Sequence, residues 1–503
     1  MKSKSYLLGY DIGSSSIKAA LVAIEDSSTV AVTHAPNTEM DMHAPQPGWA
    51  EQDPEMWWKY VCQATRQLLE QTQILPQQIQ AVGIAYQMHG LVAIDREGQV
   101  VRPAIIWCDD RAVPYGEQAF QDLGATACLT HLLNSPGNFT ASKLKWVQEN
   151  EPENFHRIYK VMLPGDYIAY KLTGSVSTTV SGLSEGTLWD FAMHEPAEIL
   201  LNYYGISPEL LPEVVPAIGI QGLINEQAAQ STGLPSGIPV GYRAGDQPNN
   251  ALALNVLEPG EIAATGGTSG VVYAVVDQYV YDNESRVNGF AHVNHQPDQP
   301  RVGILLCING AGILYRWVRN EIAGPGTSYQ DMEALAAQIP VGSDGLRILP
   351  FGNGAERMLG NTQTGVQWIN LQLNRHRRPH VYRAALEGIA FAFVYGMQVL
   401  KQMGVDLQVI RVGNDNLFQS DLFCTTISSL TGSTIEILDT TGAVGAAKAA
   451  GVAGGFFASV RDAVQSTKVL KTYLPDPDPS RYVRAYEIWE NDLFNRKKET
   501  VLL

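Results

Sequence analysis

The chain of 503 residues is poor in cysteine and in positive charge. Its five cysteines are far apart and form no CxxC pair, so neither a disulfide framework nor a zinc site of ordinary spacing is expected. The formal net charge is −16, and basic residues form no long run. This balance disfavours a nucleic-acid or anionic-membrane partner. A reducing cytosol is the compartment that fits both absences.

Long apolar segments are also missing from the sequence. The apolar run at residues 6–10 ends at Asp11, which is too short for a signal peptide. No uninterrupted apolar stretch reaches the roughly 18 residues of a membrane span. We therefore expect a cytoplasmic protein without a membrane partner.

Three common catalytic signatures cannot be found. The sequence has no GxxxxGK[ST] phosphate loop, no GxGxxG after a strand and no HExxH. Standard P-loop ATPases, Rossmann dehydrogenases and zincins are therefore disfavoured.

What remains is a globular composition with alternating strands and helices. Hydrophobic residues make up 45% and charged residues 17% of the chain, and the length suggests roughly two or three domains. Residues 6–10 and 79–85 predict buried strands, and Asp53-Pro54 predicts a helix start. This alternation is typical of α/β proteins. The pattern restarts near residue 240, so we expect one domain over residues 1–250 and a second over residues 251–503.

Two loops of small polar residues begin the two halves. Residues 11–16 separate the first two predicted strands, and residues 265–270 separate two strands of the second half. Small residues let backbone N–H groups approach phosphate oxygens, and hydroxyls add donors. Either loop alone is more typical of an ordinary hairpin, but their repetition favours phosphate sites. Asp11 is a candidate Mg²⁺ ligand, since hard cations take carboxylate oxygens.

Three further segments are candidate contacts for a sugar. Asp246 follows a predicted strand and either meets ligand hydroxyls or caps a helix. Residues 87–90 (Gln-Met-His-Gly) also follow a strand, and their histidine is either a ligand or a structural residue. Residues 107–111 (Trp-Cys-Asp-Asp-Arg) combine an aromatic platform with charges that suit a polyol; the alternative is a surface salt-bridge loop.

Together these segments resemble the FGGY family of carbohydrate kinases over essentially the whole chain. The resemblance implies an α/β fold with two actin-like, ribonuclease-H-like domains that face each other across a catalytic cleft, with ATP toward the C-terminal domain. Within the family the pattern is most similar to that of kinases for D-xylulose. The resemblance rests on residues 11–16, 48–54 (Gly-Trp-Ala-Glu-Gln-Asp-Pro), 87–90, 107–111, 245–246, 267–270 (Gly-Thr-Ser-Gly) and 442–447 (Gly-Ala-Val-Gly-Ala-Ala).

The resemblance also implies roles for individual residues. Asp246 matches the general base that takes a proton from the sugar hydroxyl, and Asp11 matches the residue nearest to the Mg²⁺ of Mg-ATP. The implied sugar contacts are Gln87, Met88, His89, Trp107, Asp109, Asp246 and Gln247. The implied nucleotide contacts are Ser14, Ser15, Ser16, Gly267, Thr268, Gly310, Gly413, Asn414 and Asn416.

Two segments depart from the family pattern. The adenosine motif of the family usually begins with three glycines, whereas residues 412–416 read Val-Gly-Asn-Asp-Asn. Nucleotide contacts and nucleotide preference are therefore open at this loop. Residues 178–181 (Thr-Thr-Val-Ser) stand where family members often carry an aspartate, and we attach no function to them.

The expected activity is phosphorylation of D-xylulose to D-xylulose 5-phosphate with ATP and Mg²⁺, and a homodimer is left open. The first alternative is another pentulose or polyol kinase of the family. His89 argues against glycerol, because a three-carbon substrate needs fewer hydrogen-bonding side chains around it. The second is a non-catalytic actin-like ATP-binding module, which would not need residues 87–90 and 107–111. The third is a sugar-sensing regulator, which would normally add a helix-turn-helix, and the first strand at Tyr6 leaves no room for one.

Overall fold

A mixed sheet of five strands forms the frame of the first half of the protein. The computed structural model describes residues 4–501, and the side chains of residues 4–495. The strand order is β13-β5-β1-β2-β3; β1 pairs antiparallel with β2 and parallel with β5, which pairs parallel with β13. The bounds are β1 (Tyr6–Ile12), β2 (Ile17–Ala23), β3 (Thr29–Ala35), β5 (Ile79–Tyr86) and β13 (Val240–Gly245).

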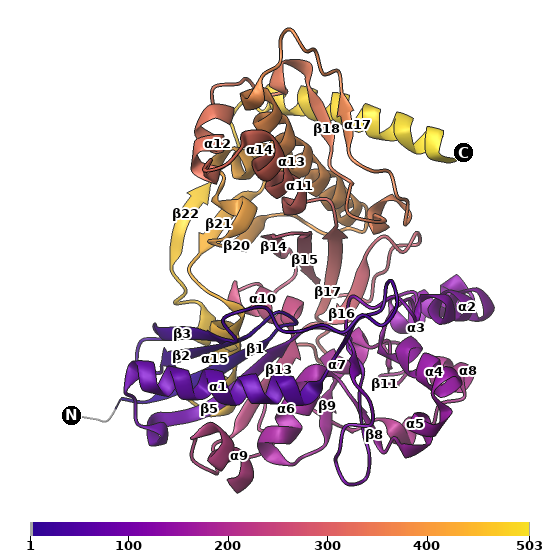
Figure 1. Ribbon diagram of the computed structural model, residues 1–503, viewed down its shortest axis with the longest axis vertical. Helices are drawn as coiled ribbons and strands as arrows, with labels where there is room; N and C mark the ends of the chain where they lie inside the picture. The colour runs from indigo at the N-terminus through magenta and orange to yellow at the C-terminus, as the bar shows by residue number, and fades with distance from the viewer. Residues whose placement is uncertain (1–3, 502–503) are drawn as a thin grey trace.

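A second mixed sheet in the other half repeats this arrangement (Figure 1). Strands β17, β15 and β14 are antiparallel neighbours, and β20 and β21 continue in parallel, which is the order and direction of the first sheet. This repetition confirms the expected two-domain, actin-like α/β fold. The bounds are β14 (Glu261–Gly266), β15 (Gly270–Val276), β16 (Asn288–Ala291), β17 (Val302–Ile308), β20 (Val409–Gly413), β21 (Thr434–Leu438) and β22 (Val469–Tyr473).

Helix α1 covers one face of the first sheet, against β2 and β3. It begins where expected, because the side chain of Asp53 accepts a hydrogen bond from the backbone N–H of Glu55. The other elements of this half are β4 (Glu51–Gln52), α1 (Pro54–Thr72), β6 (Val92–Ile94), β7 (Ala104–Ile105), α2 (Val113–Leu123), α3 (Ala125–Leu132), α4 (Thr140–Asn150), α5 (Pro152–Arg157), β8 (Lys160–Met162), α6 (Pro164–Thr173), β9 (Ser177–Thr179), α7 (Val180–Glu185), β10 (Trp189–Asp190), β11 (Glu195–Pro196), α8 (Glu198–Tyr204), β12 (Glu213–Val215), α9 (Glu226–Thr232) and α10 (Asp246–Ala253).

The second sheet is covered by a layer of helices around α13 (Figure 1). Helix α14 begins at Asp421, where the side chain of Ser420 caps it by accepting the N–H of Phe423. The elements of this half are α11 (Gly312–Trp317), α12 (Tyr329–Ala336), β18 (Arg347–Leu349), β19 (Gln367–Ile369), α13 (Arg378–Gln402), α14 (Asp421–Thr431), α15 (Gly442–Ala453), α16 (Val460–Val464) and α17 (Ser480–Val501).

Helix α13 is, by length and composition alone, long and apolar enough to cross a membrane, although Arg383 and Glu387 interrupt its apolar sequence. Of its most apolar window, 89% is buried inside the protein. It packs against α12, α14 and the second sheet. These contacts are those of a core helix.

Helix α15 belongs to the second half of the sequence but packs on the first sheet. The contact is close: a Cβ on Gly9 of β1 would lie 1.9 Å from the carbonyl oxygen of Ala443, and one on Gly83 of β5 would lie 2.0 Å from that of Ala446. Only glycine allows this approach of helix and sheet. The division into residues 1–250 and 251–503 stays a prediction, and α15 ties the second part to the first sheet.

Candidate active site

Asp246 is the first residue of helix α10 and directly follows strand β13. The N-cap of this helix is Gly245, and no side chain caps it, so the alternative of a helix-capping aspartate is wrong. Burial, with repulsion from Asp11 as the next cause, raises the pKa of Asp246 from 3.8 to about 7. A carboxylate with a pKa near neutrality is matched to the work of a general base.

Asp11 lies at the end of strand β1, close to two helix N-termini. A Cβ on Gly442, the first residue of α15, would lie 3.0 Å from Asp11 Oδ2, and Asp246 begins α10. Lys18 Nζ is 3.7 Å from the same oxygen of Asp11. Helix N-termini and a lysine favour an anion at this place. The site therefore combines a carboxylate pair with features that attract phosphate.

The donor set of this region fits Mg²⁺ delivered with a nucleotide. In the described part of the chain, no group of three or more His, Cys, Asp or Glu residues is placed to hold a metal ion. Mg²⁺ is usually bound by one or two carboxylates together with phosphate oxygens and water. Asp11 and Asp246, which are close enough to repel each other, supply such a pair.

Met88, which lies between Gln87 and His89 in the chain, packs against Gly245, the residue before Asp246. A Cβ on Gly245 would lie 2.7 Å from Met88 Cγ. His89 Nδ1 and Gln87 Oε1 are buried and have no hydrogen-bond partner among the described residues. Burial, followed by the charge of Lys143, lowers the pKa of His89 well below 6.5. The neutral ring has one donor and one acceptor nitrogen, which suits sugar hydroxyls.

Ser14, in the loop between β1 and β2, is hydrogen-bonded to residues of two other segments. Trp107 Nε1 donates to Ser14 Oγ at 3.4 Å, and Gln52 Nε2 donates to the carbonyl oxygen of Ser14 at 2.7 Å. Gln52 Oε1 in turn accepts from Gln87 Nε2 at 3.5 Å. Trp107 is 49% exposed, so its ring face is free to meet a ligand. The structure therefore brings together residues that the sequence assigned to different substrates.

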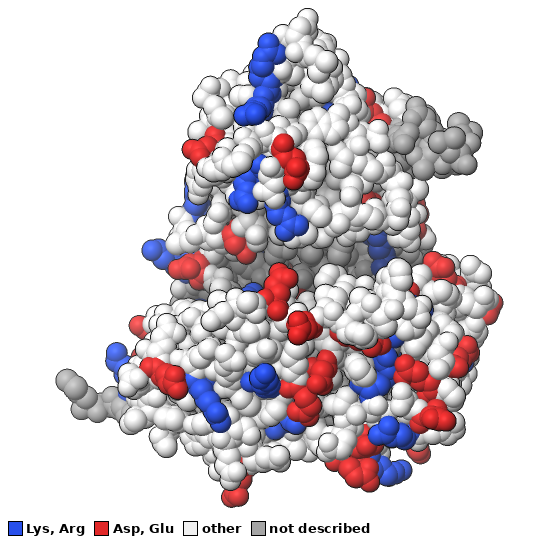
Figure 2. All heavy atoms as spheres, in the orientation of Figure 1, with Lys and Arg blue, Asp and Glu red and all other residues white. Residues whose placement is uncertain are grey.

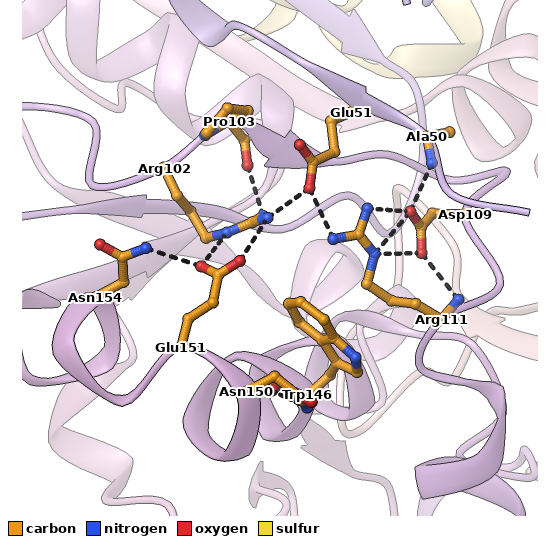
Figure 3. Close-up of polar contacts among 10 residues, drawn as sticks. All are labelled: Ala50, Glu51, Arg102, Pro103, Asp109, Arg111, Trp146, Asn150, Glu151 and Asn154. Atoms are coloured by element: carbon orange, nitrogen blue, oxygen red, sulfur yellow. Dashed lines mark hydrogen bonds and ion pairs between the residues drawn. The ribbon is translucent and has the colours of Figure 1, made fainter. Parts of the chain in front are cut away.

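Asp109 is part of a buried ionic network, so the alternative of a surface salt-bridge loop is wrong. Its side chain is fully buried and pairs with Arg111 at 2.7 Å, and it accepts the N–H of Ala50 at 2.6 Å. Arg111 also bonds Glu51 at 2.7 Å, and Glu51 bonds Arg102 at 2.6 Å (Figure 3). Sugar binding by Asp109 stays a prediction, while these contacts give its carboxylate a role in fixing residues 107–111.

Three residues of this region have no motif in the sequence. Asn138 donates to the carbonyl oxygen of Asp109 and keeps its own Oδ1 buried and without a partner in the described chain. Lys143 and Glu185 both contact the backbone of His89. For Lys143 the sequence offers one signal: it stands four residues before Val147, so a lysine lies on an apolar helix face. No sequence pattern indicated that Glu185 contacts His89.

A cavity of about 580 Å³ lies in the second half, at the loop between β14 and β15. Of the predicted nucleotide contacts, Gly267, Thr268 and Asn416 line it. Its size lies within the range of small-molecule sites. The lining residues that the sequence analysis missed are Gly266, Gly312, Tyr315, Arg316, Tyr329, Gln330, Glu333, Ala334, Leu417, Gln419, Ser420 and Asp421.

The remaining predicted nucleotide contacts lie outside this cavity. Gly310 follows β17, and its backbone N–H already donates to Glu356 Oε1 at 2.7 Å. Gly413 ends β20, and Asn414 is exposed. Ser15 and Ser16 lie in the turn between β1 and β2, on the first half. Their nucleotide contacts stay predictions.

The surface is hollowed between the two halves in Figure 2, and acidic side chains lie along the lower edge of this hollow. Asp11 and Asp246 come from the first half, while Gly267 and Thr268 come from the second. The two sets of predicted contacts therefore belong to opposite halves of the molecule.

Comparison with known proteins agrees with this arrangement. The family model described as "FGGY family of carbohydrate kinases, N-terminal domain" matches residues 6–253, and the model of the C-terminal domain matches residues 262–454. The xylulose kinase of Escherichia coli (strain K12) is 29% identical over 476 residues, which cover 93% of this chain and 94% of that protein.

Solved structures share the fold over almost the full length. The xylulose kinase of Rhodospirillum rubrum is 27% identical with a TM-score of 0.85, covering 97% of this chain and 98% of that one. The glycerol kinase of Plasmodium falciparum, solved with ADP, reaches a TM-score of 0.87 at 18% identity, covering 98% of both chains. The second likeness shows the fold alone.

Proposed function

The chain belongs to the FGGY family of carbohydrate kinases and is a phosphotransferase that uses ATP to phosphorylate a sugar hydroxyl; we propose that its substrate is D-xylulose and its product D-xylulose 5-phosphate. The observation that carries this proposal is three buried polar atoms without partners among the described residues: Gln87 Oε1 and His89 Nδ1 in the segment that follows β5, and Oδ1 of Asn138, which bonds the backbone of Asp109. Buried polar atoms without partners are costly. A ligand with several hydroxyls would satisfy them.

Asp246 is the proposed general base. Its raised pKa of about 7 lets it accept a proton from the attacking hydroxyl near neutral pH. The transition state of phosphoryl transfer is loose, so the carboxylate chiefly orients the hydroxyl and accepts its proton late. Gln247, the next residue of α10, hydrogen-bonds the carboxylate of Asp246 and helps to fix its direction.

Phosphate binding is proposed between the two small-residue loops. Residues Ser14 to Ser16 and the N-termini of α10 and α15 offer N–H and hydroxyl donors from the first half, and Thr268 offers them from the second. Lys18 adds a positive charge beside Asp11. Mg²⁺, when bound near Asp11, neutralises charge on the phosphate oxygens.

D-xylulose is favoured over glycerol by the number of polar groups on the sugar side. Three side chains hold unpartnered atoms there, and Trp107 offers an aromatic face. One of the three hydroxyls of glycerol would face Asp246 as the attacking group, which leaves two hydroxyls for these three side chains. The xylulose kinases among the relatives support the same choice.

A coupled ADP-release assay tests the proposal. The substrate panel is D-xylulose, D-ribulose, L-ribulose, L-xylulose, L-rhamnulose, glycerol and gluconate. We expect the highest kcat/KM with D-xylulose. A clear preference for another substrate of the panel would mean that the protein is a kinase of this family for that substrate and not for D-xylulose. The absence of sugar-stimulated turnover with all of them would contradict the proposal.

A further inference from the structure

The peptide unit of His89 is held from both sides by buried charged groups. The N–H of His89 donates to Glu185 Oε2 at 3.0 Å, and its carbonyl oxygen accepts from Lys143 Nζ at 3.0 Å. Glu185 is 1% exposed and Lys143 is fully buried. The two residues come from different helices, α7 and α4.

The backbone of His89 is in a conformation that ordinary residues avoid. Its φ is +40°, in the left-handed region where the Cβ is crowded by the carbonyl oxygen. Such residues persist only when their surroundings fix them. The imidazole of a residue in this left-handed conformation points in a direction that an extended backbone would not give it.

Each of the two buried groups is itself anchored. Glu185 Oε1 accepts from the hydroxyl of Tyr86, the last residue of β5, at 2.7 Å. Lys143 Nζ donates a second hydrogen bond, at 3.0 Å, to the carbonyl oxygen of Ile106, which precedes Trp107. The lysine therefore joins the two segments that carry the proposed sugar contacts His89 and Trp107.

We propose that Lys143 and Glu185 are positioning residues that hold His89 in its left-handed conformation and thereby direct its imidazole toward the sugar. We call this pair the His89 clamp. Neither side chain has to touch the sugar, because both act through the backbone of His89. The inference rests on the proposed function for its effect on sugar binding, but the conformation of His89 is tested separately.

The protonation state of the lysine does not limit the clamp. Burial lowers the pKa of Lys143 to about 7. The neutral amine still carries two N–H donors, which is the number of carbonyl oxygens that it meets. Burial raises the pKa of Glu185 well above 4.5, and either form of the carboxyl keeps an oxygen for the N–H of His89.

The kinetic test uses Lys143→Met and Glu185→Gln, each alone and combined with His89→Ala. Methionine fills a similar volume without a donor, and glutamine keeps an acceptor for Tyr86 but places amide protons near the N–H of His89. We expect each single variant to raise the KM for D-xylulose by about tenfold or more, as for a lost hydrogen bond to a charged group, with the KM for ATP within twofold. In the His89→Ala background the same changes should have effects at least threefold smaller, because the side chain that they direct is gone.

Lys145→Met is the matched control. Lys145 lies on the same helix, and its amine bonds Gln148 and the carbonyl oxygen of Tyr204, away from His89. This variant removes the same kind of side chain and should leave both KM values within twofold. Melting temperatures of all variants separate a general loss of stability from a specific loss of sugar binding.

Hydrogen exchange of the peptide covering residues 86–90 tests the clamp without turnover. We expect slow exchange in the wild type, faster exchange in Lys143→Met and Glu185→Gln, and no change in Lys145→Met. Unchanged exchange in both clamp variants, or effects on sugar KM that add fully to those of His89→Ala, would overturn the inference. If neither variant folds, fast exchange of this peptide in the wild type would overturn it and slow exchange would support it. If the wild type phosphorylates no sugar of the panel, the proposed function fails while the exchange result still decides on the clamp.

Discussion

The proposed sugar side and the proposed nucleotide side of the site are built in different ways. On the sugar side, Asp246, Lys143 and Glu185 are ionisable groups whose pKa values are displaced by burial. In the second half, a cavity of about 580 Å³ is lined by glycines, hydroxyl groups, amides and tyrosine rings, together with the charged side chains of Arg316, Glu333 and Asp421. Buried charges and unpartnered polar atoms tolerate little change in geometry. We therefore expect substitutions on the sugar side to affect turnover and sugar affinity, and those on the nucleotide side to affect ATP affinity alone.

Replacing the base should have the largest effect. Asp246→Asn keeps the size of the side chain but removes the proton acceptor. We expect kcat to fall by about 10²-fold or more, with ATP binding unchanged and sugar binding within about tenfold of wild type. Kinetics and calorimetry on one preparation measure these values. Near-normal turnover with reduced stability would contradict the assignment of Asp246 as the base.

The pH dependence of turnover should follow the same residue. Since Asp246 must be ionised to act, kcat/KM for the sugar should fall about tenfold per pH unit below the pKa of about 7. Its pKa is raised above the unfolded value, so the folded protein binds more protons between these values, and this group's contribution to stability decreases as pH rises through the range. Asp246→Asn should therefore raise the melting temperature more at pH 8 than at pH 4. An acid limb near pH 4, or a pH-independent difference in melting temperature, would argue against the raised pKa.

Substitution of His89 tests sugar binding and leaves the proposed base Asp246 in place. His89→Ala leaves sugar hydroxyls unpaired in a buried site, at a cost of about 1–3 kcal/mol, which is roughly a 5- to 150-fold rise in sugar KM. ATP affinity should stay within twofold. A sugar KM within twofold of wild type would mean that His89 is only a structural residue.

Substitution of Gly267, in the loop between β14 and β15, tests nucleotide binding. A Cβ on Gly267 would meet nothing closer than 3.6 Å, so Gly267→Val should fold normally while its side chain enters the cavity. We expect ATP affinity, measured by calorimetry, to weaken by about tenfold with sugar binding retained. A normal ATP affinity in the folded variant would move the phosphates away from this loop.

The smallest effect should come from the loop that departs from the family pattern. Asn416 lines the cavity, and Asn416→Ala removes at most a neutral hydrogen bond, about 0.5–1.5 kcal/mol or roughly 2- to 12-fold in ATP affinity. Affinities for ATP and GTP, measured side by side, would show whether this loop sets nucleotide preference. No change for either nucleotide would exclude Asn416 from the contact.

The two sides also differ in how much of them the sequence could predict. Glycine and hydroxyl residues between strands marked Gly267 and Thr268, and an acid after a strand marked Asp11 and Asp246, because these patterns are local. The repeated strand pattern at residues 6–24 and 261–276 was likewise enough to indicate two related halves.

Contacts between distant segments could not be predicted in this way. Lys143 and Glu185 reach His89 from helices that lie 54 and 96 residues away in the chain, and Tyr315 reaches the cavity from a helix without a motif. The amide of Gly310 is taken by Glu356, a pairing that no sequence pattern indicated. The alternative of a surface salt-bridge loop at residues 107–111 is wrong for the same reason, since Asp109 and Arg111 belong to a buried network that Glu51 and Arg102 complete from elsewhere.

A single-turnover experiment with ATP labelled in the γ-phosphate tests the central claim most directly. Wild type and Asp246→Asn are each mixed in excess with labelled ATP, Mg²⁺ and D-xylulose, and the products are separated. We expect label in D-xylulose 5-phosphate for the wild type and almost none for Asp246→Asn, although both proteins bind both substrates. Label only in inorganic phosphate, or equal transfer by the two proteins, would contradict it.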